Sequence, residues 1–413
     1  MEKDKTTGNA MRPLTTRPKH IAIWGGWYGS YNVGDQVLLL TITDVLTRTL
    51  GDAEFTVFTD NPDHVRTYTR LESNCSIEAL HNRRQFPRVV QTLASCDLFI
   101  FGGGVPFYEE RSHLLAMAIL VGLARIFRTP YMMWTVSSQV VQDRQAMRLF
   151  RWVLEGAKAI TYRDQHTREL FESCGVKRPM YLTADPGFWL EPREEEQAKK
   201  MIKKYGPRDE TKPLVALTPR TLRSRDGDAE THYNVKTAVQ FNQEINCFVA
   251  ALDWLYEKGF QPIFVPMNTI APDDDRIAAH IAIERAKYGR HSLLIDEKIS
   301  PRVAPVIYRQ CQLSFVARVH GGITSMIGHC PVMMYAFAPK HVGIMRAMGL
   351  ERFSLPESEA SPARTIEMIS DLVENREQLR ISIQERLEIL RQEALIPARF
   401  GAQILGIRDS LWD

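Results

Sequence analysis

Short apolar runs alternate with longer amphipathic segments over most of the chain. In the first half, apolar runs predict strands at 20–24, 54–58, 97–101, 131–136, 158–162 and 180–184. Segments with apolar positions three and four residues apart predict helices at 35–50, 112–127, 143–156 and 164–174. This rhythm is typical of a parallel sheet covered by helices on both faces. We therefore predict an α/β, Rossmann-like domain over residues 20–190.

The same pattern resumes after a charged stretch. Residues 191–212 are rich in Glu, Lys and Arg and predict either a linker that contains a helix or the edge of a domain. Beyond it, strands are expected at 214–218, 261–265, 292–295, 312–316 and 332–336, and helices near 235–257, 273–287, 301–309, 321–328 and 340–348. This predicts a second Rossmann-like domain over 213–360, helices over 361–413 and a flexible tail over 1–19. Two such halves, joined once, would face each other across a cleft, which is a common place for a ligand.

The composition argues against several kinds of function. The chain has 413 residues, with 52 Lys and Arg against 49 Asp and Glu, so it lacks the basic footprint of a nucleic-acid-binding protein. Its six cysteines show no metal-ligand spacing and predict reduced core thiols. No apolar run is long enough to span a membrane, and the first twenty residues contain no signal-peptide core. We expect a cytoplasmic protein with no transmembrane segment and no metal site.

A glycine-rich stretch at 25–36 separates the first predicted strand from the first predicted helix. Glycines such as Gly34 let a ligand approach the main chain, and the first-turn N–H groups of the helix offer an anion site. Asp35 either caps this helix or belongs to a site. The stretch lacks the Gly-x-Gly-x-x-Gly pattern, which disfavours a nicotinamide oxidoreductase. Gly103 and Gly104 end another buried run and form either an anion-binding loop or a tightly packed turn.

Basic residues follow predicted strands in both halves. Arg163 comes directly after a strand of the first half, and Arg318 and His320 come after one of the second half. If the segment stays extended, Arg318 and His320 share one face. A guanidinium can hold phosphate or carboxylate with two parallel bonds, and an imidazole can transfer a proton. Gly321 and Gly322 then open the next predicted helix, whose amides would add to an anion site.

Two further cations follow predicted strands of the second half. Arg220 is the nearest to its strand end of three arginines at 220–225, and Lys340 and His341 follow the run at 332–336. They either face the same sheet edge as Arg318 or are solvated surface residues.

Taken in order, several short motifs resemble those of the polysaccharide pyruvyl transferase family. They extend over roughly residues 20 to 350 and comprise Tyr31–Asp35, Phe101–Gly104, Tyr162–Asp164, Asp185–Gly187, Ala317–His320, Gly328–Met333, Lys340–Gly343 and Met348–Leu350. The resemblance implies a fold similar to the two-domain GT-B glycosyltransferases. It also implies the transfer of pyruvate from phosphoenolpyruvate to a sugar as a ketal.

The resemblance also implies roles for individual residues. Donor binding falls to Arg163 and to the motif Arg318–His320, in which Val319 stands where the family usually has leucine. Lys340 and Arg220 add to the candidate donor-binding set. His320 is then the candidate general acid, and Asp35 the candidate group for activating or binding the sugar hydroxyl. The scheme demands no metal or organic cofactor.

The expected partners are phosphoenolpyruvate and a sugar or lipid-linked oligosaccharide, the latter with peripheral association to a membrane. The first domain would form the acceptor side of the cleft and the second the donor side. Two alternatives stay open from the sequence. The same fold would serve a nucleotide-sugar glycosyltransferase, or a binding protein of this fold that has lost its activity.

Overall fold

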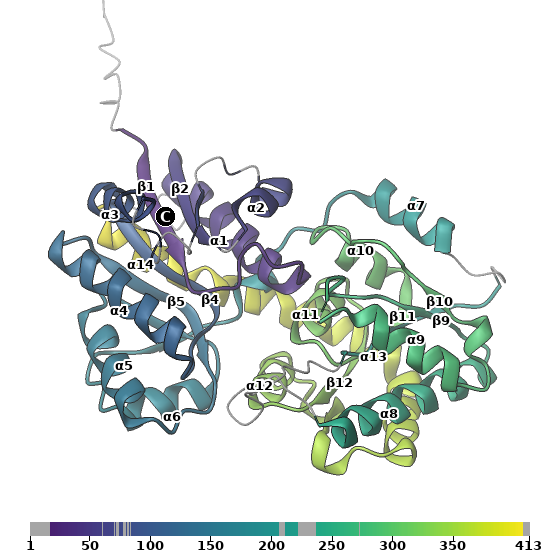
Figure 1. Cartoon of the computed structure of the whole chain (residues 1–413). Coiled ribbons are helices and arrows are strands. Elements are labelled where there is room, and N and C mark those ends of the chain that lie inside the picture. The colour runs from purple at the N-terminus through teal and green to yellow at the C-terminus, as the bar shows by residue number, and fades with distance from the viewer. Residues whose placement is uncertain are drawn as a thin grey trace, which may run out of the picture.

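The computed structural model describes residues 17–59, 61–69, 71, 74–76, 80, 82, 84–205, 211–221, 237–271 and 273–407. They form two α/β halves that lie side by side (Figure 1). The predicted tail at 1–19 lies outside the described residues as far as position 16.

The first half is built on a seven-stranded sheet with the order β3-β2-β1-β4-β5-β6-β7 and parallel pairing throughout. Its strands are β1 (Lys19–Trp24), β2 (Ala53–Thr59), β3 (Asn74–Ser76), β4 (Leu98–Phe107), β5 (Tyr131–Ser138), β6 (Ile160–Tyr162) and β7 (Tyr181–Leu182). Its helices are α1 (Val33–Leu50), α2 (Pro62–Thr69), α3 (Phe86–Ser95), α4 (Arg111–Ile126), α5 (Arg144–Gly156), α6 (Gln165–Ser173) and the 3₁₀ turn η2 (Pro186–Trp189). The central strands are buried on both faces, which explains why they are continuous apolar runs in the sequence.

The second half has a six-stranded parallel sheet with the order β10-β9-β8-β11-β12-β13. Its strands are β8 (Leu214–Thr218), β9 (Gln261–Phe264), β10 (Leu293–Leu294), β11 (Cys311–Val316), β12 (Val332–Ala336) and β13 (Ser354–Pro356). Its helices are α7 (Glu195–Tyr205), α8 (Ala238–Glu257), α9 (Asp275–Arg285), α10 (Ala304–Arg309), α11 (Val319–Ile327) and α12 (Pro339–Met348), with 3₁₀ turns η3 (Gly289–His291), η4 (Glu351–Phe353) and η5 (Glu357–Glu359).

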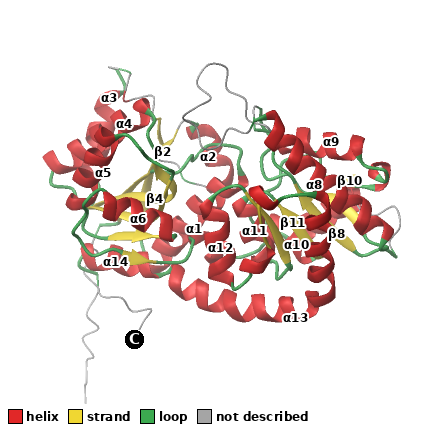
Figure 2. Cartoon of the chain, turned by 90° about the horizontal axis from the view of Figure 1, so that it is seen from below, coloured by secondary structure: helices red, strands yellow, loops and turns green. Residues whose placement is uncertain are grey.

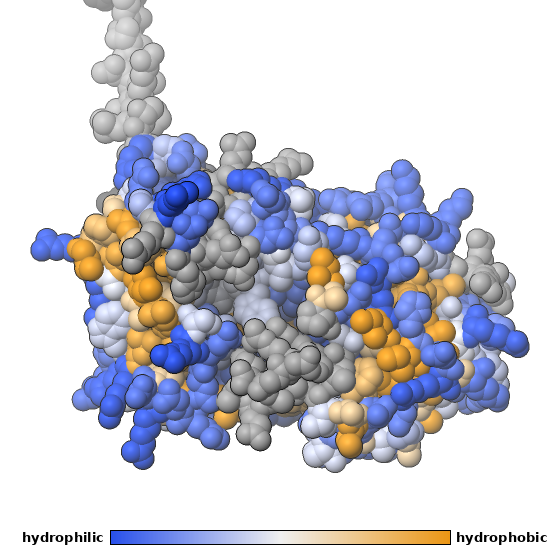
Figure 3. Space-filling view, viewed as in Figure 1, coloured by the Kyte–Doolittle hydropathy of each residue, from blue (hydrophilic) through white to orange (hydrophobic). Residues whose placement is uncertain are grey.

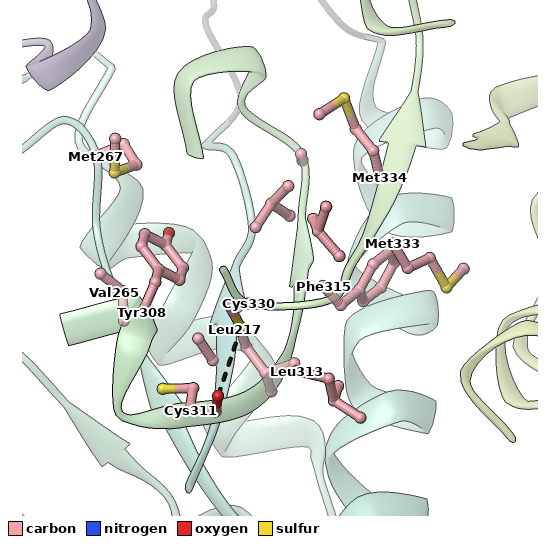
Figure 4. Close-up of a cluster of buried hydrophobic side chains, with 14 of the residues drawn as sticks. Leu217, Val265, Met267, Tyr308, Cys311, Leu313, Phe315, Cys330, Met333 and Met334 are labelled. Atoms are coloured by element: carbon pink, nitrogen blue, oxygen red, sulfur yellow. Dashed lines mark hydrogen bonds between the residues drawn. The ribbon is translucent and has the colours of Figure 1, made fainter. Parts of the chain in front are cut away.

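The core of the second half lies between its sheet and its helices (Figure 4). Phe315 of β11 stacks on Phe248 of α8 with ring centroids 4.2 Å apart. Cys311 and Cys330 are buried in this core, and the Cys330 thiol donates to the Cys311 carbonyl at 3.7 Å. The cysteines whose side chains are described are buried and free, as expected for core thiols.

In both sheets the strand order reverses at an equivalent place, between β1 and β4 in the first half and between β8 and β11 in the second. Because adjacent crossovers leave such a point in opposite directions, a crevice opens outside the carboxyl ends of these strands, and ligands of open α/β sheets bind there. The two Rossmann-like halves of the predicted fold class are thus confirmed, and each contributes one such edge.

The end of the chain departs from the prediction that the halves are joined only once. The helix α13 (Pro362–Ala394) packs on the second half, and α14 (Ile396–Ile404) returns to the first half (Figure 2). There Leu395 and Ala398 share a core cluster with Leu46 and Met132. The chain therefore crosses between the halves twice.

The charged stretch 191–212 contains the expected helix, α7, whose Ala198 and Met201 enter the core of the second half, so it is a domain edge as well as a connection. Other local features depart from the prediction for simple reasons. β4 does not end at the glycines, because it continues through them to Phe107. The elements α2, α3, β3 and β13 lack the long apolar runs on which the prediction rested. Within the described residues, no helix combines the length and apolar character needed to cross a membrane.

Candidate active site

A cavity of about 300 Å³ lies between the carboxyl edges of the two sheets. Four basic side chains line it, one from the first half and three from the second: Arg163, Arg220, Arg318 and Lys340. The other ionisable side chains in its wall are Tyr31, Asp35, Asp273, His320 and His341. The structure therefore brings the predicted catalytic residues and the predicted donor-binding side chains to one place.

The first turn of α1 forms one wall of this cavity. Asn32 is its N-cap, with the side-chain oxygen accepting from the Gly34 N–H at 2.9 Å, so Asp35 is not the cap. Asp35 instead accepts from the Ser30 hydroxyl at 3.2 Å and faces the cavity. Burial raises the pKa of Asp35, although His320 and Ser30 oppose the shift. A carboxylate with a raised pKa is a better base than an exposed one.

Arg163 and His320 approach the same buried carboxylate from opposite halves of the molecule. Arg163 Nη1 pairs with Asp185 Oδ2, and His320 Nε2 lies 3.8 Å from Asp185 Oδ1. Burial alone would raise the pKa of Asp185, but Arg163 and His320 outweigh it and hold the pKa well below its usual range. Nε2 of His320 is buried and makes no hydrogen bond within the described residues.

Gly34 sets the position of the His320 ring. A Cβ added to Gly34 would overlap Nδ1 of His320 and lie 2.6 Å from its Cγ. Only a residue without a side chain lets the imidazole of one half rest on the first turn of α1 in the other. The N–H of Gly34 is used by the cap, so this glycine serves close packing rather than anion binding.

Arg318 and His320 do not share a face as predicted, because β11 ends at Val316 and α11 begins at Val319. The chain turns between them, and Arg318 points away to α9. Its Nε and Nη2 both bond the Asp275 carboxylate, at 3.1 and 2.6 Å, and its Nη1 bonds Asp273 at 3.0 Å. The two-bond face of this guanidinium, which the sequence assigned to a donor, is therefore occupied by Asp275. Arg318 still lines the cavity and adds its charge there.

Lys340 and Arg220 line the cavity from the second half. Arg220 is buried, lies 3.8 Å from Asp273 and stacks over the Phe337 ring at 4.9 Å, so it is not a loop charge. Burial, Arg163 and Arg220 lower the pKa of Lys340 to about 7. This lysine can change charge near neutral pH. The other two arginines of the stretch 220–225 lie outside the described residues.

His341 is buried rather than on the surface. Its Nδ1 lies 3.1 Å from the Ala338 carbonyl oxygen, and its ring packs on Phe337. Burial and the neighbouring Lys340 hold its pKa well below the usual value, so the ring is neutral at pH 7.

The remaining predicted glycines divide into two groups. Gly103 and Gly104 adopt φ values of +26° and +94°, and Gly104 lines the cavity, so a side chain there would be strained and would face the ligand space. Gly321 and Gly322 do not line it. The Gly322 N–H bonds the Arg318 carbonyl inside α11, and a Cβ on Gly322 would meet Met334. Val319 lies in the cavity wall between Arg318 and His320.

The sequence reasoning missed the acidic partners. Asp185 was noted only as part of a motif, and Asp273 and Asp275 were not singled out. The signals available were an Asp-Pro-Gly after a strand and three successive aspartates before a helix, and both patterns fit plain capping. The described residues contain no group of three or more potential metal ligands.

Two Rossmann-like domains with a cavity between their carboxyl edges define the GT-B class. Solved structures with a similar fold support this assignment of the fold. UDP-GlcNAc 2-epimerase from Neisseria meningitidis, bound to UDP-GlcNAc, has a TM-score of 0.58 at 9% identity, covering 93% of this chain and 100% of that one. Trehalose 6-phosphate synthase from Burkholderia multivorans has a TM-score of 0.52 at 10% identity, covering 94% and 98%. At such identities the likeness concerns the fold.

The comparison of sequences is more informative than the comparison of folds. The polysaccharide pyruvyl transferase family model matches residues 32–338, and the chain belongs to this family. The amylovoran biosynthesis protein AmsJ of Erwinia amylovora is 18% identical over 330 residues, which cover 78% of this chain and 73% of AmsJ. The predicted family is confirmed, and it defines a transferase that acts on polysaccharide.

Proposed function

We propose that this protein transfers pyruvate from phosphoenolpyruvate to two hydroxyls of a sugar in a polysaccharide or its lipid-linked precursor. The product is a pyruvate ketal, and phosphate is released. The observation that carries the proposal is the convergence of Arg163, Arg220, Arg318 and Lys340 on one cavity of a family member. Phosphoenolpyruvate bears a carboxylate and a phosphate on three carbons, so it needs several cations close together.

We assign the donor contacts according to what each cation already holds. Arg318 is bound to Asp273 and Asp275 and contributes charge while fixing α9 beside α11. Arg163 pairs with Asp185 and lies 3.9 Å from Asp164, Arg220 lies 3.8 Å from Asp273, and both guanidiniums line the cavity. Lys340 has a lowered pKa, and a dianionic phosphate beside it would restore its charge. We therefore propose that Lys340 and Arg163 bind the donor directly. Arg220 and Val319 complete this part of the cavity wall.

We assign the proton transfers to two titratable side chains in the cavity wall, His320 and Asp35. His320, supported by the ionised Asp185, donates a proton to the methylene carbon of the donor, and the first sugar hydroxyl adds to the cationic carbon. The proton of that hydroxyl replaces the one that His320 gave. Asp35 then assists the second hydroxyl, which displaces phosphate and completes the ketal. Of the two hydroxyl protons, one ends on the new methyl group and the other on phosphate.

In this scheme the acceptor enters along the first half, where Asp35 lies, and the donor rests against the second half, which supplies Arg220, Arg318 and Lys340. Since phosphoenolpyruvate is a metabolite of the cell interior, we place the reaction in the cytoplasm.

A direct assay tests the proposal. The protein is incubated with phosphoenolpyruvate and a panel of sugar acceptors, and phosphate release is followed together with the product mass. The expected result is equal amounts of phosphate and of a product heavier by one pyruvate ketal, both lost in His320→Gln. Phosphate release without a heavier product would contradict the proposal, and so would transfer of a sugar in a parallel incubation with UDP-GlcNAc in place of phosphoenolpyruvate.

A further inference from the structure

The outer face of α4 carries an apolar stripe far from the cavity wall. Leu115 is 51% exposed and Ile126 is 73% exposed, and Phe127 directly after the helix is also exposed. Ile119 and Leu123 continue the row in half-buried positions at helical spacing. The space-filling view shows this apolar stripe running along α4, with hydrophilic residues beside it (Figure 3). A contiguous apolar row on a surface helix marks an interaction site.

The helices on either side supply positive charge. α4 packs between α3 and α5, and in the sequences of these three helices Glu155 is the sole acidic residue. Their arginines are all exposed: Arg88, Arg111, Arg125, Arg144, Arg148 and Arg151. The chain as a whole has almost equal numbers of basic and acidic residues. The bias is therefore local to this surface, which we call the α4 face.

An aromatic side chain joins the stripe to the basic border. Trp152 of α5 is partly exposed, and the Arg125 guanidinium of α4 lies 4.2 Å from its ring. Tryptophan and arginine have an apolar body and a polar end, so they suit a boundary between lipid and water. Apolar residues along one helix, bordered by arginines and an aromatic ring, are the pattern of a helix that lies in a membrane interface.

We propose that the α4 face binds the surface of a membrane that contains anionic phospholipid. The apolar stripe enters the headgroup region, and the arginines contact lipid phosphates. The charge selects this occupant over a second copy of the chain, since two α4 faces would bring their arginines together. The inference goes beyond the proposed reaction, and its test requires neither donor nor acceptor.

The test is flotation of the full chain with vesicles of phosphatidylcholine, with and without phosphatidylglycerol. We expect binding to the anionic vesicles that weakens with added salt, and little binding to the neutral ones. One variant removes the apolar contacts, Leu115→Asp with Ile126→Asp. Its matched control changes residues of α13 with 51% and 49% exposure, Ile381→Asp with Ile389→Asp.

A second pair of variants isolates the charge. Arg144→Ser, Arg148→Ser and Arg151→Ser together should lower the partition onto anionic vesicles by roughly two orders of magnitude. The control replaces exposed arginines outside the α4 face, Arg285→Ser, Arg290→Ser and Arg352→Ser. The apolar variant should lose at least about tenfold. Equal binding by each variant and its control would overturn the proposal. So would an absence of vesicle binding together with a dimer that Leu115→Asp dissociates, because a second copy would then cover the face.

Discussion

The charge of Lys340 should change when the donor binds. Burial and the charges of Arg163, Arg220 and Arg318 lower its pKa to about 7, so at pH 8 only about one-tenth of the molecules carry the proton in the empty site. A donor phosphate beside the amine favours the charged form and raises the pKa again. Binding at pH 8 should therefore take up about 0.9 proton per site. Since the charged lysine binds the donor, affinity should be highest below pH 7 and fall up to about tenfold per pH unit above it.

The assay is calorimetry with phosphoenolpyruvate at pH 8 in two buffers of different ionisation enthalpy, since the difference in observed heat gives the number of protons. Lys340→Met should lose both the uptake and most of the affinity at pH 7. Lys340→Arg, which is charged at every pH used, should bind without proton uptake and with little dependence on pH. Lys199→Met, at an exposed site, is the control.

Proton uptake by the Lys340→Met variant shows whether Lys340 is the group that is protonated when the donor binds. Proton uptake that persists in this variant would show that another group titrates on binding. Binding by the normal protein with no uptake would show that the donor does not lie against Lys340, and the donor would then have to rest on Arg163 and Arg220 alone.

Three other predictions follow from the same cavity. His320→Gln should keep most of the donor affinity and lose roughly two to four orders of magnitude in kcat; a loss confined to affinity would remove its role as acid. Gly34→Ala should displace the His320 ring and lower kcat at least about tenfold at unchanged thermal stability, whereas Gly122→Ala, with open space around its Cβ, should leave kcat unaltered. Arg318→Lys should reduce the free energy of unfolding by about 2 kcal/mol in urea titrations, because one ammonium cannot hold Asp275 by two bonds. A stable Arg318→Lys protein with weakened donor binding would instead return Arg318 to the donor contacts.

The strands could be predicted because their signal is local. β8 and β12 coincide with their predicted ranges, since each is a short, fully buried run between polar loops. The return of α14 to the first half could not be predicted, because the apolar positions of a helix do not say which sheet will cover them. β13 was missed for a related reason, since three residues at a sheet edge carry no period.

Of the residues in the candidate site, some could likewise be placed from the sequence and others could not. His320 and Lys340 could be placed together because residues that follow neighbouring parallel strands meet at one edge of their sheet, and Arg163 could be placed near them because it follows a strand of the other sheet, whose edge faces the same cleft. Their acidic partners could not be placed. Asp185 is 135 positions before His320, and nothing in the sequence indicates that the two halves dock so that these side chains come within 4 Å. The engagement of Arg318 by Asp275 is another tertiary pairing of this kind.

The position of Asp185 makes the acid chemistry dependent on the docking of the two halves. Asp185 caps η2, and η2 packs against α1 of the first half and against α11 and α13 of the second. Arg163 fixes the carboxylate from one side, and the second half brings His320 to the other. If the halves separated, His320 would lose both its contact with the Asp185 carboxylate and the Gly34 surface that orients its ring. The second crossing through α13 and α14 opposes such separation, because α14 is held in the first half by Leu395 and Ala398. The helical end of the chain thus supports the proposed acid without contacting it.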